Sequence, residues 1–423
     1  MSQRIVPGTD SIYLDDDGNL VTQNIDFQTF KAIAMVCDNG TTFPTSPAPT
    51  AGQWFYRSDL KILYLYQSGW QARISFGAVT MYVDGALGSD GISQGYGTGA
   101  DAAKTIQYAL NRVPPINGGN VTINVAAGTY NESLIIQGKY YTGNYSLIIQ
   151  GVLSDVQSGT SSGDGVLGTG ATQGSVLDAG NMAGHADKLI YLAADGDYRV
   201  IDSVDVGGDN ATIVGTFTSK PLSGEAYVIK DWATIISGVS SVTLRPGQFN
   251  VEFYDIAFSG STRSLLAAQA DVTYERCKFS SFVQPRVSSA IALTNCLVTI
   301  ASGAATLRVE STTVATVTRS KLFNNGVLSG YCIWGYNASQ INITSGTILD
   351  CGTPNTNTGI TVSILGAVVC YSTAANGYCR IRNAAIGIST YGGGVATNTS
   401  NNQYSGNTAD ETAASAPDWG YID

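Results

Sequence analysis

Four carboxylates in the second half of the chain have the residue types and spacing needed for acid–base chemistry. They are Glu252, Asp255, Asp271 and Glu275. Glycoside hydrolysis uses two such groups, about 5–5.5 Å apart for retention or about 6.5–9.5 Å apart for inversion. Arg245 and Arg276 lie nearby in the sequence, so the same carboxylates could instead form a solvent-facing ladder of weak ion pairs. Both interpretations remain open at this stage.

A second group of residues could bind sugars through ring faces and a cation. Residues 331–336 read YCIWGY, and we expect Trp334 and Tyr336 to lie in a long loop. With Arg276 they form the predicted glycan-binding set, because aromatic rings offer an apolar face beside a polar edge. Packing of the same rings between neighbouring subunits is an equally open alternative.

The remaining candidates predict neither a metal nor a cofactor. His185 is the only histidine, and its position near a Gly-rich segment favours a loop residue over a proton shuttle. The run DDDGN from Asp15 has its glycine at the wrong step for a calcium loop, and no bidentate glutamate follows. A turn is the better interpretation of that run.

These residues must be positioned by a repeat that covers the second half of the chain. Its copies are VEFYDIAFS from Val251, VTYERCKFS from Val272, IALTNCLVT from Ile291, ATVTRSKLF from Ala315 and INITSGTIL from Ile341. Their starts are 21, 19, 24 and 26 residues apart, and CRIRNAAIG from Cys379 is taken as a later copy after a gap of 38 residues. Positions one, three, six and eight are mainly apolar, which predicts two short strands separated by a two-residue polar bend.

Such copies stack in parallel, with equivalent positions about 4.8 Å apart along a rod. The sequence therefore predicts an all-β fold, a right-handed single-stranded parallel β-helix, and the 49 glycines with only 13% charged residues agree with it. Seven cysteines form no CxxC pair, which favours free buried thiols made in a reducing cytoplasm. Cys277 and Cys296 share a column, where stacked thiols are favoured over a disulfide.

Residues 79–151 resemble the opening coil of pectate-lyase-like β-helix proteins. The matching stretches are MYVDGALGSDG, DAAKTIQYALNRVPP, NVTINVAAGTYNESLIIQGK and YSLIIQG. Within them, Asp101 is the expected N-cap of a helix that ends at Pro114 and covers the open end of the rod. Glu132, in the corner GTYNE, is expected to brace that corner.

Residues 52–76 form a predicted aromatic hairpin that resembles one common near the start of phage tail-fibre and tailspike proteins. The expected organisation has four parts, the third of which carries two interruptions. They are an N-terminal β-rich virion-attachment segment at 1–40, a Pro-rich linker with the hairpin at 41–78, the β-helix at 79–400, its Gly-rich loop at 157–180 and β-insert at 195–230, and a C-terminal tail at 401–423.

The resemblance implies a bacteriophage tailspike or tail fibre that adsorbs to bacterial surface polysaccharide. It also implies a homotrimer, attached to a virion tail or baseplate protein through the N-terminal region and synthesised in the host cytoplasm. The dense carboxylate cluster of pectate lyases and the Gly-His-Gly of galacturonan hydrolases are both missing. A polysaccharide hydrolase or lyase on the same rod, and a purely structural virion component, therefore remain as alternatives.

Charge and hydropathy restrict the partners further. The net charge of −10 would repel nucleic acid. No run of eighteen apolar residues occurs, so we expect no membrane insertion, and the N-terminus shows no secretion signal.

Overall fold

The computed structural model describes residues 37–351 apart from short gaps, and outside that range it describes strands only. The gaps are 46–47, 92–93, 169–172, 179–181, 206, 240, 245–249, 261–264, 269–270, 287–289, 301–304, 312, 325–330 and 345. Side chains are described from residue 39 to 351, except in the gaps and at 265–268 and 286, and at isolated positions up to 390. Arg245 and the run from Asp15 to Asp17 lie outside the described residues.

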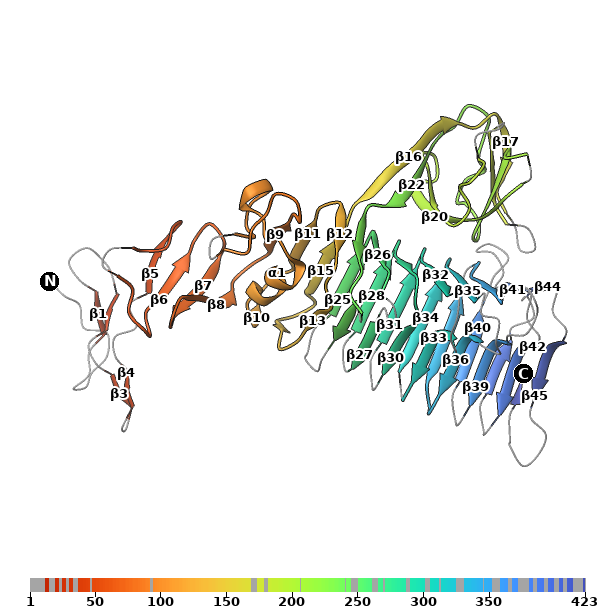
Figure 1. The fold of residues 1–423 in the computed structure, drawn as a ribbon. Helices are drawn as coiled ribbons and strands as arrows, with labels where there is room; N and C mark the ends of the chain where they lie inside the picture. The colour runs from red at the N-terminus through yellow and green to blue at the C-terminus, as the bar shows by residue number, and fades with distance from the viewer. Residues whose placement is uncertain are drawn as a thin grey trace.

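Three parallel sheets wind into a rod, which confirms the predicted parallel β-helix (Figure 1). The first rod sheet contains β9 (Val79–Val83), β11 (Val121–Val125), β15 (Ser146–Gln150), β25 (Asn250–Tyr254), β28 (Asp271–Glu275), β31 (Ala290–Thr294), β34 (Val314–Thr318), β37 (Gln340–Thr344), β40 (Ala367–Tyr371), β43 (Val395–Asn398) and β46 (Tyr421–Ile422). The second contains β12 (Gly128–Tyr130), β23 (Thr234–Ile236), β26 (Ile256–Phe258), β29 (Lys278–Phe279), β32 (Leu297–Ile300), β35 (Lys321–Asn324), β38 (Ile348–Asp350), β41 (Arg380–Arg382) and β44 (Gln403–Ser405). The third contains β13 (Leu134–Ile136), β24 (Val242–Leu244), β27 (Leu265–Ala268), β30 (Val283–Arg286), β33 (Ala305–Glu310), β36 (Tyr331–Tyr336), β39 (Thr358–Ser363), β42 (Ile386–Tyr391) and β45 (Ala409–Ala413).

The predicted register is confirmed along the first rod sheet. The five predicted starts pair in one column, which runs Val251, Val272, Ile291, Ala315, Ile341. In the second rod sheet the fifth copy is shifted by one residue, since Leu322 pairs with Leu349 and not with Ile348. An extra residue near the left-handed Gly346 (φ 72°) causes this shift.

Two expectations about the end of the rod are wrong. The segment from Cys379 was aligned as a first-sheet strand, but β41 pairs with β38 in the second rod sheet, and the next first-sheet strand is β40. Residues 401–423 were expected to form a tail, yet β44, β45 and β46 extend all three sheets. Their small and polar residues hide the apolar alternation on which the repeat was recognised.

The bend between the first and second rod sheets is a single left-handed residue. Asp255, Arg276, Asn295 and Arg319 occupy it, with φ of 60°, 52°, 51° and 47°. The preceding residue, which we had included in a two-residue bend, ends the first-sheet strand, as Glu275 ends β28. One such residue suffices because it reverses the face to which the following side chain points.

Like residues stack inside the rod. The Phe253 and Tyr274 rings are 5.0 Å apart and nearly parallel, and Phe258 stacks on Phe279 at the same distance. Cys277 and Cys296 are buried free thiols, as expected. Burial raises the pKa of the Cys277 thiol, so it behaves as a small apolar group.

The predicted helix is present but begins later than expected. It is α1 (Ile106–Arg112), and its N-cap is Thr105, whose hydroxyl accepts from the amide of Tyr108 at 3.2 Å. Asp101 ends a short 3-10 turn instead. The carboxylate of Glu132 accepts from the amides of Ile106 and Gln107 at 3.0 and 2.8 Å, so Glu132 braces the corner by holding the first turn of α1.

The aromatic hairpin belongs to a mixed sheet that continues into the first coils of the rod. This hairpin sheet contains, in spatial order, β14 (Tyr140–Tyr141), β10 (Ile116–Asn117), β8 (Trp70–Ser75), β7 (Ile62–Tyr66), β6 (Trp54–Arg57) and β5 (Cys37–Gly40). Nearer the N-terminus, β1 (Ile12–Leu14) pairs with β2 (Leu20–Thr22), and β3 (Ile25–Phe27) with β4 (Phe30–Ala32). Within the described residues no helix is long and apolar enough to cross a membrane.

The insert is larger than expected and includes the segment that we had interpreted as a Gly-rich loop. It contains β16 (Leu153–Thr160), β17 (Gly163–Val166), β18 (Ser175–Leu177), β19 (Leu189–Leu192), β20 (Asp197–Val204), β21 (Asn210–Ile213) and β22 (Ala226–Trp232). Glycine is needed where the backbones of two neighbouring strands of the insert approach each other closely. A Cβ on Gly165 would lie 2.1 Å from the carbonyl oxygen of Ser175.

The insert folds back over the second rod sheet (Figure 1). The apolar contact joins Leu189, Val200, Val214 and Trp232 of the insert to Ala257, Leu297 and Ile348 of the rod. Outward positions of the second rod sheet are therefore buried, which explains apolar pairs such as Leu297–Val298 on both faces of one strand.

Candidate functional site

The first rod sheet brings three of the four predicted carboxylates, Glu252, Asp271 and Glu275, onto one outward face. Glu252 lies on β25 and Glu275 on the neighbouring β28, where Tyr254 is the direct partner of Glu275. The Tyr254 hydroxyl donates to Glu252 Oε2 at 2.7 Å. Strand spacing of about 4.8 Å and a rise of about 3.3 Å per residue place the two glutamate Cα atoms about 8 Å apart.

The predicted carboxylates Asp255 and Asp271 have hydrogen-bond partners of their own. Asp255 lies in the bend, where it accepts from Arg276 Nε at 2.7 Å and from the Gln150 amide at 2.6 Å. Asp271 begins β28, four residues before Glu275, and accepts from the amide of Ala290 at 3.1 Å. Glu252 lies opposite Thr273, two residues from both Asp271 and Glu275, so its Cα is about equally far from each. Asp255 and Glu275 share the guanidinium of Arg276, so Glu252 and Glu275 are one of several neighbouring carboxylate pairs.

The surroundings of Glu252 and Glu275 favour the neutral form of Tyr254. Burial, followed by the hydrogen bond to Glu252, raises the pKa of Tyr254 above its ordinary value. Arg276 pairs with both Glu275 and Asp255. The arrangement can hold a hydroxyl-rich ligand by hydrogen bonds, and it contains the two carboxylates that acid–base cleavage would need.

A second outward face lies on the third rod sheet. Tyr331, Trp334 and Tyr336, here called the aromatic ladder, lie on β36 with successive ring centroids 5.7 and 5.8 Å apart. The guanidinium of Arg308 lies 4.4 Å from the centre of the Trp334 ring, directly across the pairing with β33. Glu310 pairs with Arg308 and accepts from Gln284 at 3.1 Å.

The expectation that Trp334 and Tyr336 lie in a loop is wrong. Both side chains alternate with the buried Ile333 and Gly335 along a strand. Gly335 obscured the pattern; a Cβ there would lie 2.9 Å from the end of the Ile341 side chain, so the strand is closely packed at this position. The rings are fixed by the sheet, which suits them to a preorganised contact.

Arg276 does not join the aromatic ladder. It lies at the bend between the first and second rod sheets, where its guanidinium is 5.1 Å from the centre of the Tyr198 ring in the insert. Its carbonyl accepts from Trp232 Nε1 at 2.6 Å. The predicted glycan-binding set is thus divided between two faces of the rod.

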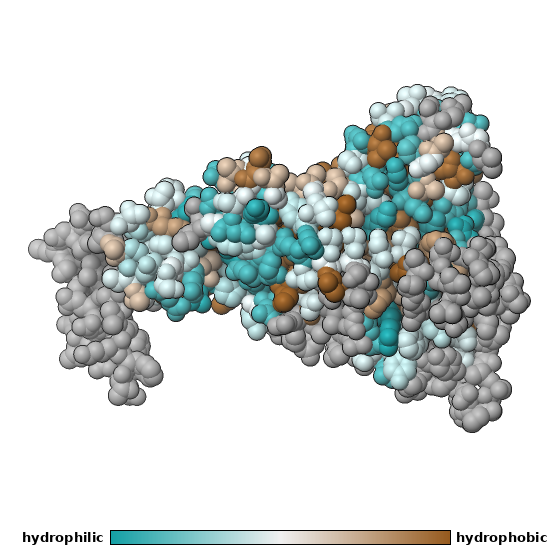
Figure 2. Space-filling model, in the orientation of Figure 1, coloured by the Kyte–Doolittle hydropathy of each residue, from teal (hydrophilic) through white to brown (hydrophobic). Residues whose placement is uncertain are grey.

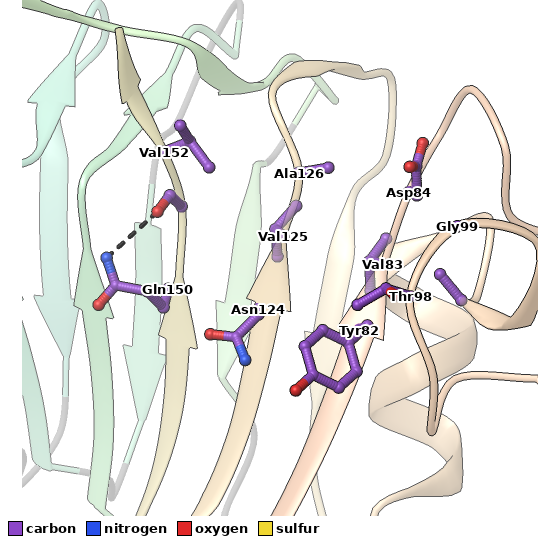
Figure 3. A pocket seen from close by; sticks show the side chains of 12 residues that line it. Tyr82, Val83, Asp84, Thr98, Gly99, Asn124, Val125, Ala126, Gln150 and Val152 are labelled. Carbon is purple, nitrogen blue, oxygen red and sulfur yellow. Dashed lines mark hydrogen bonds between the residues drawn. The ribbon is translucent and has the colours of Figure 1, made fainter.

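Near the start of the rod, a cavity of about 200 Å³ opens beside the first sheet (Figure 3). Tyr82, Asn124 and Gln150 line it from the adjacent strands β9, β11 and β15. Their column continues in register to Tyr254 and Glu275. Polar outward side chains therefore follow one line from this cavity to the glutamate pair, and the sequence analysis missed it because these three strands were not part of the repeat.

His185 lies in the insert, away from both faces. Its Nε2 is 2.8 Å from Gln157 Oε1, and burial together with Lys188 lowers its pKa. Nothing in this geometry assigns it a proton transfer. Within the described residues, no three His, Cys, Asp or Glu side chains are grouped as metal ligands.

The coloured part of the visible surface is mainly hydrophilic. Figure 2 shows scattered apolar residues on the visible face of the rod and of the insert, separated by polar ones. Isolated apolar residues of this kind are ordinary on a protein surface.

Comparison with known proteins defines the class no further than its fold. No protein family matches the chain, and no curated protein matches it. Among solved structures, the Gp54 tailspike of Acinetobacter baumannii bacteriophage AP22, in complex with A. baumannii capsular saccharide, is 10% identical with a TM-score of 0.21, covering 71% of each chain. The tailspike protein gp49 from Pseudomonas phage LKA1 is 10% identical with a TM-score of 0.21, covering 82% of this chain and 69% of that one.

Both similar structures are phage tailspikes, the group that the hairpin resemblance implies. At these TM-scores the likeness carries no argument about the sites of this chain. The class defined here is that of parallel β-helix proteins, and it rests on the strand pairing.

Proposed function

We propose that this protein is a phage tailspike or tail fibre that adsorbs to a bacterial surface polysaccharide. The observation that carries the proposal is the aromatic ladder with Arg308, held outward on a rigid sheet. Sugar rings stack on aromatic faces through their apolar C–H groups, while their hydroxyls need nearby polar partners. Arg308 and Glu310 supply those partners beside Trp334.

We further propose a homotrimer, attached to a virion tail or baseplate protein through the first forty residues. The second rod sheet is covered by the insert of the same chain, which leaves the first and third sheets for contacts between subunits or with glycan. In this proposal the protein is a component of the virion tail, made in the host cytoplasm.

The glutamate pair supports one alternative function, cleavage of the bound polysaccharide. Their Cα separation of about 8 Å allows a carboxyl spacing in the range of about 6.5–9.5 Å used by inverting hydrolases. Glu252 and Glu275 would then be the acid and base, with Tyr254 positioning Glu252. Oligosaccharide released from the bound polysaccharide would support this alternative.

Adsorption is tested by incubating the purified chain and its Trp334→Ala variant with capsules and lipopolysaccharides from many bacteria. We expect saturable binding to at least one polysaccharide and at least a tenfold loss of affinity in the variant. Tyr145→Ala, which removes an exposed tyrosine elsewhere on the rod, should bind normally. Equal binding by both variants and the parent would contradict the proposal.

Light scattering on the same variants separates binding from subunit packing. If the aromatic ladder were instead a contact between subunits, Trp334→Ala would lower the molar mass in solution. We expect an unchanged mass.

A further inference from the structure

A polar cavity of about 450 Å³ lies where the hairpin sheet meets the end of α1. It is lined by Tyr64, Trp70, Gln71, Ala72, Arg73, Asn111, Arg112, Val113, Pro115 and Lys139. Three of these residues are cations, and none is acidic. The chain has a net charge of −10, so this cavity is a local excess of positive charge on a negatively charged protein.

The strand register places two of the cations in one row. β8, β10 and β14 align Ile74 with Ile116 and Tyr140. Arg73 and Lys139 each precede a member of that row by one residue. They are therefore separated by two strand spacings, or about 10 Å, with Pro115 between them.

Lys139 is 9% exposed, and its Nζ donates to the carbonyl of Val113 at 2.6 Å. That carbonyl belongs to the C-cap residue of α1 and uses one of the three ammonium protons. Burial lowers the pKa of Lys139 to about 8, and no carboxylate among the described residues offsets that burial. A buried cation without a counter-ion is costly, and a bound anion would relieve the cost.

The guanidinium groups of Arg73 and Arg112 also have donors without a hydrogen-bond partner. The Nε atoms of Arg73 and Arg112 are buried and have no hydrogen-bond partner among the described residues. Arg112 is held between the rings of Tyr96 and Tyr108, at 5.4 and 5.7 Å from their centres, so its position is fixed. These nitrogens are donors, and they match the oxygen atoms of a carboxylate or phosphate.

We propose that this cavity binds the carboxylate of an acidic sugar residue. Arg73, Arg112 and Lys139 would bind the charged group, while the half-buried Trp70 offers ring surface for the sugar itself. Asn111 and Gln71 can exchange hydrogen bonds with its hydroxyls. The inference shares with the proposed function only the premise that the ligand is a saccharide, since the cavity is separate from the aromatic ladder.

The test uses the full chain and three small probes, D-glucuronate, D-glucose and inorganic phosphate, in calorimetric or NMR titrations at pH 7. We expect saturable binding of glucuronate and none of glucose. Lys139→Met and Arg73→Gln should each weaken glucuronate binding at least tenfold. Lys220→Met, which alters an exposed lysine of the insert, is the matched control and should bind as the parent does.

Thermal unfolding of each variant checks that the fold is retained, and the two variants lie on different segments of the hairpin sheet. Glucuronate binding that is absent in the parent, or unchanged in both variants, would overturn the proposal. Phosphate binding without glucuronate binding would overturn the carboxylate assignment. Trp334→Ala should leave glucuronate binding unchanged, so failure here is distinguishable from failure of adsorption at the aromatic ladder.

Discussion

At the residue scale, the stacked interior makes each core ring costly to remove. Phe279 is fully buried between Phe258 and Tyr274. Phe279→Ala should lower the free energy of unfolding by about 3–5 kcal/mol, since it removes a buried ring and leaves a cavity. Urea denaturation of parent and variant measures this difference.

Asp255→Asn is the matched comparison at the bend between the first and second rod sheets, where Asp255 is 8% exposed. Asparagine also adopts the left-handed backbone that this bend requires, and it can still accept one bond from Arg276. We expect the variant to fold and to lose less stability than Phe279→Ala. A larger loss for Asp255→Asn would contradict the assignment of these two positions.

The ionisation of Lys139 should make glucuronate binding in the polar cavity depend on pH. With a pKa of about 8, its ammonium loses its proton as pH rises through that value, and the attraction for an anion falls. The arginines remain charged throughout, and burial places the pKa of Tyr64 well above this range. Glucuronate affinity should therefore decrease between pH 7 and pH 9, and titrations at both values test it.

The same shift affects stability in the absence of ligand. The folded pKa of Lys139 lies below its unfolded value, so between about pH 8 and pH 10.5 the unfolded chain binds more protons. The destabilising contribution of the buried ammonium is thus largest below pH 8 and is relieved as pH rises. Lys139→Met should remove this dependence, which unfolding measured from pH 7 to pH 10 would detect.

At the element scale, the insert depends on glycine to bring its strands together. Gly165→Ala would place a methyl group against the carbonyl of Ser175, so we expect the insert to lose stability while the rod retains its own. Hydrogen exchange should rise in β17 and β18 and stay unchanged in β25 and β28. Gly69→Ala, where a Cβ meets nothing within 4 Å, is the control.

The sequence predicted the rod but not everything that lies on it. The apolar columns from Val251 to Ile341 determined the register because one face of each strand is buried. The loop assignment for Trp334 failed because Gly335 broke the alternation. The polar cavity lined by Arg73, Arg112 and Lys139 could not be predicted. These residues are distant in sequence and meet only because the hairpin sheet pairs with the first coils.

At the scale of the whole molecule, buried ion pairs join the insert to the rod. Asp202 of the insert, almost fully buried, accepts from both terminal nitrogens of Arg382 at 2.6 and 2.8 Å and lies 3.2 Å from Lys321. Asp187 and Asp197 add pairs with Lys321 and Arg319. With the apolar contact beneath them, these pairs fix the insert over the second rod sheet.

Asp202→Asn should release this contact without unfolding the rod. In the variant, Arg382 and Lys321 lose the negative charge that neutralises them. Breaking a buried ion pair in this way lowers the free energy of unfolding by about 3–5 kcal/mol. Hydrogen exchange should increase in β19 and β20 but not in β31. Lys220→Met breaks an exposed pair of the insert and should have no such effect.

In the proposed function, polysaccharide binds the aromatic ladder of the third rod sheet. Hydrogen–deuterium exchange of the full chain, with and without a polysaccharide that it binds, tests this most directly. We predict protection concentrated in β33 and β36, around Arg308 and Trp334. Protection confined to other parts of the rod, with β33 and β36 unchanged at saturation, would contradict it.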